Sequence, residues 1–266
     1  MDLSQSLVIV GGGNMGTALV GGLIDSGLNP SNITVVEIDP QKRSTLESSF
    51  GIHTSDVIVG GDGVLIAVKP GDAAAVSAQA GELGVRRILS IAAGISVTTL
   101  QNAAGDSAHV LRAMPNTPAL VRQGITAICG SDSCTEDDYL WAENLLAAVG
   151  VVVRVPESHM DAVTAVAGSG PGYLFLIAEA LLDAAVAEGL PHDTANTLVR
   201  QLFLGAGVLL ENSPESPASL RERVTSPNGT TAAGLAVFED HGLREIVHKA
   251  VQAAAQRSKE MGREQK

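Results

Sequence analysis

Glycines near the N-terminus carry the clearest chemical signal of this sequence. Gly11, Gly13 and Gly16 form a Gly-x-Gly-x-x-Gly pattern between an apolar run and an amphipathic stretch. In such a turn the first glycine permits a tight bend, the second lets a pyrophosphate approach the backbone, and the third lets helix and strand pack closely. The free amides that open the helix favour the negative charge of the phosphates. The pattern predicts a dinucleotide site that also includes Asn14 and Met15.

The acidic residue that ends the next apolar run bears on which dinucleotide is bound. Glu37 is placed to accept a hydrogen bond from the ribose 2′-hydroxyl, which favours NADH and would repel the 2′-phosphate of NADPH. Lys42 and Arg43 follow closely and could hold that phosphate, although exposed residues at the start of a helix are an equally good interpretation. We expect NADPH or NADH as the cofactor, with a slight preference for NADH.

Three later apolar runs end in segments rich in small residues, proline and asparagine. Open α/β sheets bind ligands at the carboxyl ends of their strands, so three such ends in succession suit a nicotinamide site. The residues expected to contact the cofactor there are Val68, Lys69, Pro70, Ala92, Ala93 and Asn116.

Two segments in the second half of the chain indicate a place for a small anion. Residues 168–173 and 224–231 each put small residues at the expected start of a helix. Free amides there can bind a carboxylate without any Lys or Arg, although ordinary capping by Ser and Thr is the alternative. The residues expected to contact the substrate are Ser169, Gly170, Ser226, Asn228, Gly229, Thr230 and Thr231.

Other chemistries find little support in the sequence. There is no Ser-His-Asp arrangement and no spacing of metal ligands, so we expect no metal site. Cys129 and Cys134 are interpreted as reduced packing residues, because no histidine partner is indicated. The expected site therefore holds a small anion and presents it to a cofactor, with little side-chain acid–base chemistry.

Alternating strands and helices are needed to position the first group of residues. Apolar runs predict strands at 7–10, 33–37, 64–68, 88–91, 109–112, 125–128 and 151–154. Amphipathic stretches between them predict helices at 14–27, 41–50, 72–82, 96–104 and 135–148. This alternation predicts an α/β fold with an N-terminal, Rossmann-type, doubly wound sheet.

Beyond Pro156 the sequence contains no convincing strand run. Helical spacing indicates segments near 160–189, interrupted at 168–172, and then 193–212, 217–224, 230–240 and 243–261, with a tail that frays from Arg257. Stretches 173–188 and 194–211 carry so little charge that we expect a second subunit to bury their apolar surfaces. We expect a dinucleotide-binding domain over 1–158 and an all-helical domain over 159–266 that binds substrate and forms a homodimer.

Bulk composition limits the classes of partner. The 266 residues are 45% hydrophobic, and the formal net charge of −12 argues against nucleic acid or an anionic membrane as the partner. The first five residues lack the basic region of a signal peptide, and charges and glycines interrupt the apolar runs before they could span a bilayer. We expect a soluble, cytoplasmic protein that acts on a small molecule.

Along nearly its whole length the chain resembles the pyrroline-5-carboxylate reductases. Order, spacing and identity match in several segments, and residues 224–231 followed by Ala233-Gly234-Leu235 are the most specific of them. The sequence departs from the family where Asn228 replaces a glycine and Gly172 replaces an alanine. Asparagine tolerates left-handed backbone angles, so the first departure is compatible with the same turn. The other matching segments are residues 11–15, 68–70, 91–94, 112–118 and 168–171.

The resemblance implies a reaction and an assembly. A hydride would pass from the nicotinamide to the imine carbon of 1-pyrroline-5-carboxylate and yield L-proline, the final step of proline biosynthesis. The resemblance places the substrate carboxylate at the amides of residues 228–231 and the Thr231 hydroxyl near the ring nitrogen, where it orients the ring or relays a proton. It also implies a dimer through interleaved helical domains, often assembled into a decamer.

Two other functions compete with this one. A β-hydroxyacid-type dehydrogenase has the same two-domain plan but uses a lysine early in the helical domain, and residues 160–248 contain none. A non-catalytic, nucleotide-binding regulatory protein would bind NADH without reducing an imine, and the fold alone does not exclude it. The expected carboxylate site argues against the second, because a sensor of the cofactor has no use for it.

Overall fold

The computed structural model describes residues 6–264, and the chain forms two compact units. The first unit consists of two segments of the chain, one that ends at Ser169 and one that begins at Ala254. The second unit is Gly170–Ala253. These units differ from the expected domains, 1–158 and 159–266, which stay a prediction. Residues 1–5, on which the expectation about a signal peptide depends, lie outside the described residues.

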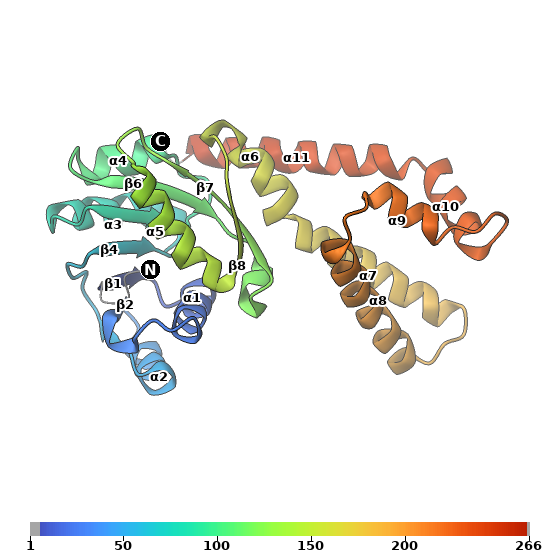
Figure 1. The fold of residues 1–266 in the computed structure, drawn as a ribbon, viewed down its shortest axis with the longest axis horizontal. Helices are drawn as coiled ribbons and strands as arrows, with labels where there is room; N and C mark the ends of the chain where they lie inside the picture. Colours follow the sequence, from blue (N-terminus) through green and yellow to red (C-terminus); the bar gives the residue numbers. More distant parts are fainter. Residues whose placement is uncertain (1–5, 265–266) are drawn as a thin grey trace. The chain divides into compact units, whose positions relative to one another are not determined.

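One sheet of eight strands forms the centre of the first unit (Figure 1). Its order is β3-β2-β1-β4-β5-β6-β7-β8, and all neighbours are parallel except β6 and β7. The strands are β1 (Leu7–Val10), β2 (Ile33–Val36), β3 (His53–Ser55), β4 (Gly63–Ile66), β5 (Arg87–Ser90), β6 (His109–Met114), β7 (Gly124–Gly130) and β8 (Gly150–Arg154).

Helices cover both faces of this sheet. Alternate residues of β1 point into two separate cores: Leu7 and Ile9 pack with residues of α1 and α5, whereas Val8 and Val10 pack with residues of α3 and α4. Burial on both faces explains why the strands are apolar without alternation, and it confirms the doubly wound α/β fold. The helices are α1 (Asn14–Asp25), α2 (Pro40–Phe50), α3 (Pro70–Glu82), α4 (Val97–Ala104) and α5 (Glu136–Leu146). Short 3-10 turns occur at Pro30–Asn32, Thr117–Val121, Ala147–Val149 and Glu157–His159.

Two features of the sheet were not predicted. Strand β3 was not predicted, because its three residues are polar and only partly buried and form no apolar run. The direction of β7 was not predicted either: β7 runs antiparallel to β6, with Met114 opposite Ala127. Strand direction depends on the path of the loops rather than on the apolar pattern of the strand itself.

A long helical segment follows the sheet. Helix α6 (Met160–Val163) passes through a π-helical turn, Thr164–Gly168, into α7 (Gly170–Ala187). The amide of Ser169 donates to the carbonyl of Thr164 at 2.9 Å. Residues 168–173 do open a helix, since α7 begins at Gly170 with Pro171 second, but the π turn runs directly into it, so the expectation of a free amide at Ser169 is wrong. A π turn accommodates Pro171, which lacks an N–H group, without ending the helix.

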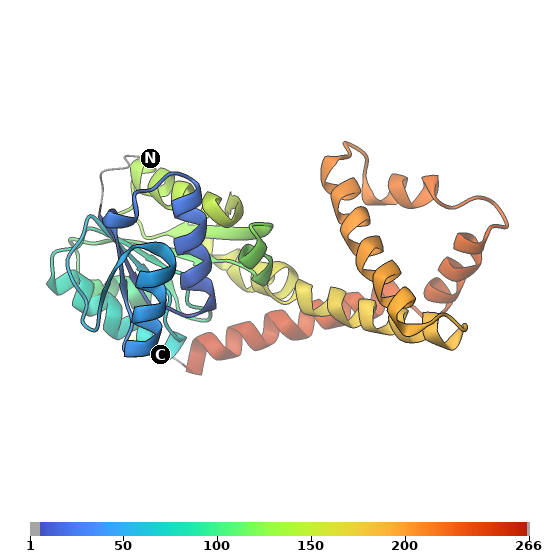
Figure 2. The same cartoon turned by 90° about the horizontal axis from the view of Figure 1, so that it is seen from below.

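The second unit is built from helices alone within the described residues, as expected (Figure 2). Many of its apolar side chains are exposed in the single chain, such as Phe175 in α7 at 68% and Leu204 in α8 at 62%. By length and composition Glu157–Ala187 would suffice to cross a membrane, but a helix covered by a second subunit has the same character. The helices are α7, α8 (His192–Asn212), α9 (Pro217–Arg223), α10 (Thr230–Asp240) and most of α11 (Leu243–Glu264).

The last helix differs from the expectation at its end. Helix α11 continues to Glu264, and its last turns belong to the first unit. Ser258 is only 7% exposed. The prediction of a tail that frays from Arg257 is wrong, because charged residues on one face of a helix say nothing about what the opposite face contacts.

Candidate functional site

The glycine-rich turn after β1 has the geometry of a phosphate cradle. Gly11 has a φ of +114°, and a Cβ there would lie 2.5 Å from the carbonyl oxygen of Ala67. A Cβ on Gly16 would overlap the carbonyl oxygen of Gly11. A Cβ on Gly13, by contrast, would meet nothing within 4 Å. The fold itself therefore requires Gly11 and Gly16, whereas Gly13 leaves open space at the start of α1, where a pyrophosphate would fit.

The carboxylate of Glu37 lies at this same turn. Its Oε2 accepts from the amide of Gly12 at 3.1 Å, and its Oε1 accepts from the amide of Asp39 at 3.0 Å. Lys42 Nζ is 4.0 Å from Oε2, and Arg43 Nη1 donates to the carbonyl of Glu37 at 2.7 Å. A carboxylate oxygen can accept more than one hydrogen bond, so Glu37 can still receive a ribose hydroxyl. One nitrogen of Arg43 is thus engaged with the backbone, while the guanidinium keeps further donors, so its contact with a phosphate stays a prediction.

Strand register explains why distant segments meet at this turn. Val10 of β1 pairs with Val36 of β2 and with Ile66 of β4, so the residues that follow these strands share one edge of the sheet. Lys69 is exposed and precedes Pro70, the first residue of α3. The predicted cofactor residues Val68, Lys69 and Pro70 thus lie on the edge that carries the glycine-rich turn.

The loop after β5 continues the same edge. Ile66 pairs with Ser90, and the amide of Ile91 donates to the carbonyl of Ile66 at 3.0 Å. The buried Ser90 hydroxyl accepts from the amide of Ala92 at 3.3 Å, which holds the loop close to the sheet. Gly94 then turns the chain with a φ of +72°. Ala92 is buried in the core beneath this loop, whereas Ala93 is partly exposed, so Ala93 leaves room at the surface for a flat ring, and the cofactor contact of both residues stays a prediction.

The side chain of Asn116 connects three segments. Its Nδ2 donates to the carbonyl of Ala167 at 3.1 Å, and its Oδ1 accepts from the amide of Ile125 at 3.0 Å. Asn116 thus joins the end of β6 to β7 and to the π turn. Both ends of the amide are occupied within the chain, so this geometry gives it a structural role, and its cofactor contact stays a prediction.

One cavity of the first unit brings predicted cofactor and substrate residues together. It has a volume of about 260 Å³ and is lined by Ala93 of the β5–α4 loop and by Ser169 after the π turn. The remaining lining residues are Gly94, Thr164, Ala254, Arg257, Ser258 and Met261. The sequence analysis missed the contribution of α11, although the spacing of Ala254, Ser258 and Met261 marks one face of a helix.

The second unit carries the other predicted substrate residues. The amide of Gly229 donates to the carbonyl of Ser226 at 3.0 Å, which closes a turn with Asn228 at a φ of +60°. Asparagine therefore adopts the left-handed angle for which the resemblance suggests glycine. Helix α10 begins at Thr230, and the amides of its first turn have no acceptor within the helix. The exposed side chain of Thr231 lies at this helix start.

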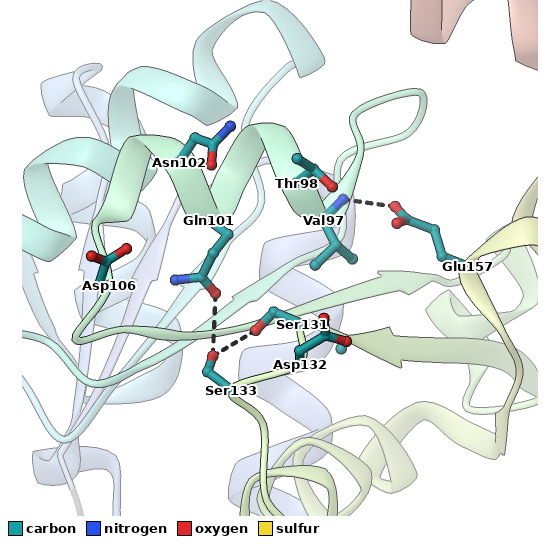
Figure 3. A pocket seen from close by; sticks show the side chains of 10 residues that line it. Val97, Thr98, Gln101, Asn102, Asp106, Ser131, Asp132, Ser133 and Glu157 are labelled. Atoms are coloured by element: carbon teal, nitrogen blue, oxygen red, sulfur yellow. Dashed lines mark hydrogen bonds between the residues drawn. The ribbon is translucent and has the colours of Figure 1, made fainter.

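A second hollow of the first unit has the wrong chemistry for these ligands. Figure 3 shows it between α4 and the loop after β7, with a volume of about 330 Å³. Asp106, Asp132 and Glu157 line it without any lysine or arginine, and Gln101 and Ser133 are hydrogen-bonded across it. None of the predicted site residues faces it. Its acidic lining would repel a dinucleotide or a carboxylate substrate.

Buried polar groups nearby have structural explanations. Arg112 is 6% exposed and donates to Glu157 Oε1, which also accepts from the amide of Val97 at the start of α4. Burial, and secondarily the charge of Glu157, raises the pKa of the Cys129 thiol to about 12. Cys129 is therefore a packing residue, not a nucleophile. Among residues 6–264 no group of three or more His, Cys, Asp or Glu side chains is arranged to hold a metal ion.

Sequence models of two protein families match this chain. One is described as pyrroline-5-carboxylate reductase dimerisation and matches residues 157–261. The other is described as NADP oxidoreductase, coenzyme F420-dependent, and matches residues 6–94. The helical half is thus similar to a dimerisation domain, and the glycine-rich half is similar to an NADP oxidoreductase.

Relatives are similar over nearly the full length. A pyrroline-5-carboxylate reductase of Synechocystis sp. is 40% identical over 98% of this chain and 100% of its own. The structure of a pyrroline-5-carboxylate reductase from Coxiella burnetii has a TM-score of 0.92 and 35% identity, over 97% of this chain and 98% of its own. Pyrroline carboxylate reductase of Plasmodium falciparum, solved with NADP bound, has a TM-score of 0.84 and 28% identity, over 97% and 98% of the two chains.

Proposed function

Because the chain belongs to the pyrroline-5-carboxylate reductase family, we propose that it reduces 1-pyrroline-5-carboxylate to L-proline, the final step of proline biosynthesis. A hydride passes from the reduced nicotinamide to the imine carbon, and one proton completes the amine at the ring nitrogen. The observation that carries the proposal is the cavity that is lined both by Ala93, expected at the cofactor, and by Ser169, expected at the substrate.

The residues of the chain bind and orient, whereas the nicotinamide dinucleotide supplies the hydride when it is bound. The turn at Gly13 and the start of α1 hold the pyrophosphate, and Ala92 and Ala93 let the ring approach the sheet edge. An imine that binds protonated needs no side-chain acid, and the cavity lining contains no carboxyl group, with Arg257 as its charged residue. Catalysis then rests on proximity and on a fixed charge environment.

Residues of the second unit are proposed to bind the substrate. The first amides of α10 bind the carboxylate, and the hydroxyl of Thr231 contacts the ring nitrogen and orients it or relays a proton. Ser226, Asn228, Gly229 and Thr230 shape this turn and donate to the same carboxylate. Gly170, the first residue of α7, directly follows Ser169 in the chain and is proposed to contact the substrate with it. These roles rest on the family motifs and on the geometry of the turn.

The choice between the two cofactors is the finer part of the proposal. Dependence on NAD(P)H follows from the family, and we propose a slight preference for NADH. In support, the carboxylate of Glu37 is fixed at the glycine-rich turn by two amides, where a 2′-phosphate would meet its charge. The relative from Plasmodium falciparum was solved with NADP bound, which favours NADPH instead.

We also propose a cytoplasmic homodimer, which can assemble further into a decamer. The match to a dimerisation family supports association through the helical unit. Phe175 and Leu204 of this unit are exposed apolar side chains that a second subunit would bury. A net charge of −12 disfavours nucleic acid and anionic membranes as partners.

The test is a parallel assay of the full chain with 1-pyrroline-5-carboxylate and either NADH or NADPH, followed by the loss of reduced-nicotinamide absorbance. Substrate-dependent oxidation and formation of proline are expected, and the ratio of the two rates gives the cofactor preference. A folded chain that binds a dinucleotide but oxidises neither cofactor would overturn the proposal and favour the non-catalytic regulatory protein. If imine reduction fails, a second assay with a β-hydroxyacid and NAD⁺ or NADP⁺ follows, and reduction of that cofactor would favour a β-hydroxyacid-type dehydrogenase instead.

A further inference from the structure

The last turns of α11 contact the loop that follows β5, within the first unit. A Cβ on Gly94 would stand 3.5 Å from the Cβ of Met261, which is van der Waals contact. A Cβ on Gly262 would stand 3.4 Å from the carbonyl oxygen of Gly94. The C-terminal end of the helix is therefore packed against the loop that presents Ala92 and Ala93.

One hydrogen bond holds these turns in place. The Ser258 hydroxyl donates to Asp161 Oδ1 at 2.7 Å, between residues that are 97 positions apart. Ser258 is nearly buried, and Asp161 lies in α6, one turn before the π turn that ends at Ser169. A hydrogen bond to a carboxylate is roughly twice as strong as one between neutral groups. The bond therefore couples α11 to the segment that carries Ser169.

These contacts make α11 one wall of the cavity. Ala93 comes from the β5–α4 loop, Thr164 and Ser169 from the π turn and its end, and Ala254 and Ser258 from α11. Removal of the Ser258 hydroxyl would leave α11 packed against the loop through Met261 and Gly262 but would break its hydrogen bond to α6. The separation of Ala93 and Ser169 depends on that helix, since α11 contacts the loop through Gly94 and the π-turn segment through Asp161.

We propose that Ser258 is a positioning residue of the reductase, which acts through Asp161 to hold α11 as the wall of the cavity where the nicotinamide and the substrate ring meet. The inference rests on the proposed function. Ser258 contacts neither reactant in this account. It fixes the distance between the loop at Ala93 and the turn at Ser169, and a misplacement of about 1 Å between reacting groups can cost on the order of a hundredfold in rate.

The experiment compares Ser258→Ala with the parent chain in steady-state kinetics and in dinucleotide binding. We expect kcat/KM for 1-pyrroline-5-carboxylate to fall about tenfold, while the Kd of the dinucleotide changes less than about twofold because the glycine-rich turn is untouched. Ser258→Thr keeps the hydroxyl and is expected to retain kcat/KM. Asp161→Asn keeps an acceptor oxygen without the charge, and its kcat/KM should fall about two- to threefold. This variant tests the same hydrogen bond if S258A does not fold.

Ser77→Ala is the matched control. Ser77 is a fully buried helical serine, and its hydroxyl donates to the carbonyl of Leu100 at 2.9 Å between α3 and α4. It lines neither the cavity at Ala93 and Ser169 nor the acidic hollow beside α4. Both S77A and S258A should lower Tm, but only S258A should lower kcat/KM. Equal losses of Tm with kcat/KM unchanged in both variants would show that Ser258 merely stabilises the fold.

Hydrogen exchange separates this inference from the proposed function. S258A should speed amide exchange in residues 91–97, and S77A should not. A parent chain that oxidises neither cofactor would overturn the proposed function, yet the exchange result would still decide whether Ser258 secures the loop. Unchanged exchange in residues 91–97 of S258A would overturn the positioning role whatever the parent chain catalyses.

Discussion

At the scale of single residues, Thr231 is the position with the sharpest expected effect on turnover. Its exposed side chain stands at the start of α10, beside amides that lack acceptors within the helix. Thr231→Ala should lower kcat about tenfold or more and leave dinucleotide affinity about unchanged, because only a contact to the reacting ring is lost. Steady-state kinetics and a dinucleotide titration measure the two quantities.

The matched variant is Thr231→Ser, which keeps the hydroxyl and removes only a methyl group. It should retain most of the turnover that Thr231→Ala loses. If Thr231→Ala turns over substrate at the parent rate, Thr231 does not belong to the site. Equal losses in both variants would instead assign the effect to packing of the methyl group.

Glu37 is the residue that we propose sets the cofactor preference, through its charge. Glu37→Ser should shift the ratio of kcat/KM values toward NADPH, about tenfold, because a fixed carboxylate no longer opposes the 2′-phosphate. Glu37→Gln separates two effects, since it drops the charge but keeps an oxygen that can accept from the amide of Gly12. A cofactor ratio that moves in neither variant would mean that Glu37 does not face the ribose.

At the scale of elements, Asp138 joins α5 to two strands. Its carboxylate accepts from the amide and hydroxyl of Thr135 at the helix start, from Arg87 of β5 at 2.9 Å and from His109 of β6 at 2.6 Å. Burial of Asp138 opposes its ionisation, but these hydrogen bonds outweigh burial and hold the pKa well below its ordinary value of 3.8. The charged form is therefore bound more tightly in the folded chain than in the unfolded one.

A lowered pKa in the folded state fixes the sign of the pH dependence. The contribution of Asp138 is complete above the ordinary carboxyl pKa and is lost as the pH falls below about 4. Asp138→Asn should lower the free energy of unfolding by about 2 kcal/mol at neutral pH, and the difference from the parent chain should shrink in acid. Denaturant unfolding at several pH values measures both effects.

Asp137→Asn is the control for this experiment. Asp137 is an exposed acid in the same first turn of α5, so it shares the favourable helix end without the buried hydrogen bonds. It should change stability by no more than about 0.5 kcal/mol. A pH-independent difference between Asp138→Asn and the parent chain would contradict the assignment.

At the scale of the whole molecule, the exposed apolar face of the helical unit predicts association. Phe175→Glu places a charge on α7 where a second copy should pack, and burial of an unpaired charge is costly. The variant should shift the oligomer toward monomer by light scattering, at protein concentrations where the parent chain is a dimer or larger. Loss of the dimer should also reduce turnover if the partner covers the site.

Val57→Glu is the matched change outside that face. Val57 is 64% exposed in the first unit, so it tests an added carboxylate on an apolar residue away from the helical unit. The oligomeric state should stay that of the parent chain. An oligomer that survives Phe175→Glu intact would place the interface away from α7.

The sequence by itself determined the class of fold and predicted the chemistry of the site, because both predictions depend on local patterns. Apolar runs of strand length and the glycine spacing after β1 are written within a few residues of one another. They sufficed for the doubly wound sheet and for the helical second half. The family motifs at residues 168–171 and 224–231 added the reaction.

Only the tertiary structure decided which of these segments meet. No local pattern encodes the reversed β7, the short polar β3, or the π turn that carries the helix past Pro171. The return of α11 to the first unit, through Ser258 and Asp161, depends on a contact between residues 97 positions apart. Such contacts arise from packing after the elements have formed, so a charged C-terminal segment such as residues 257–264 gives no sign of them.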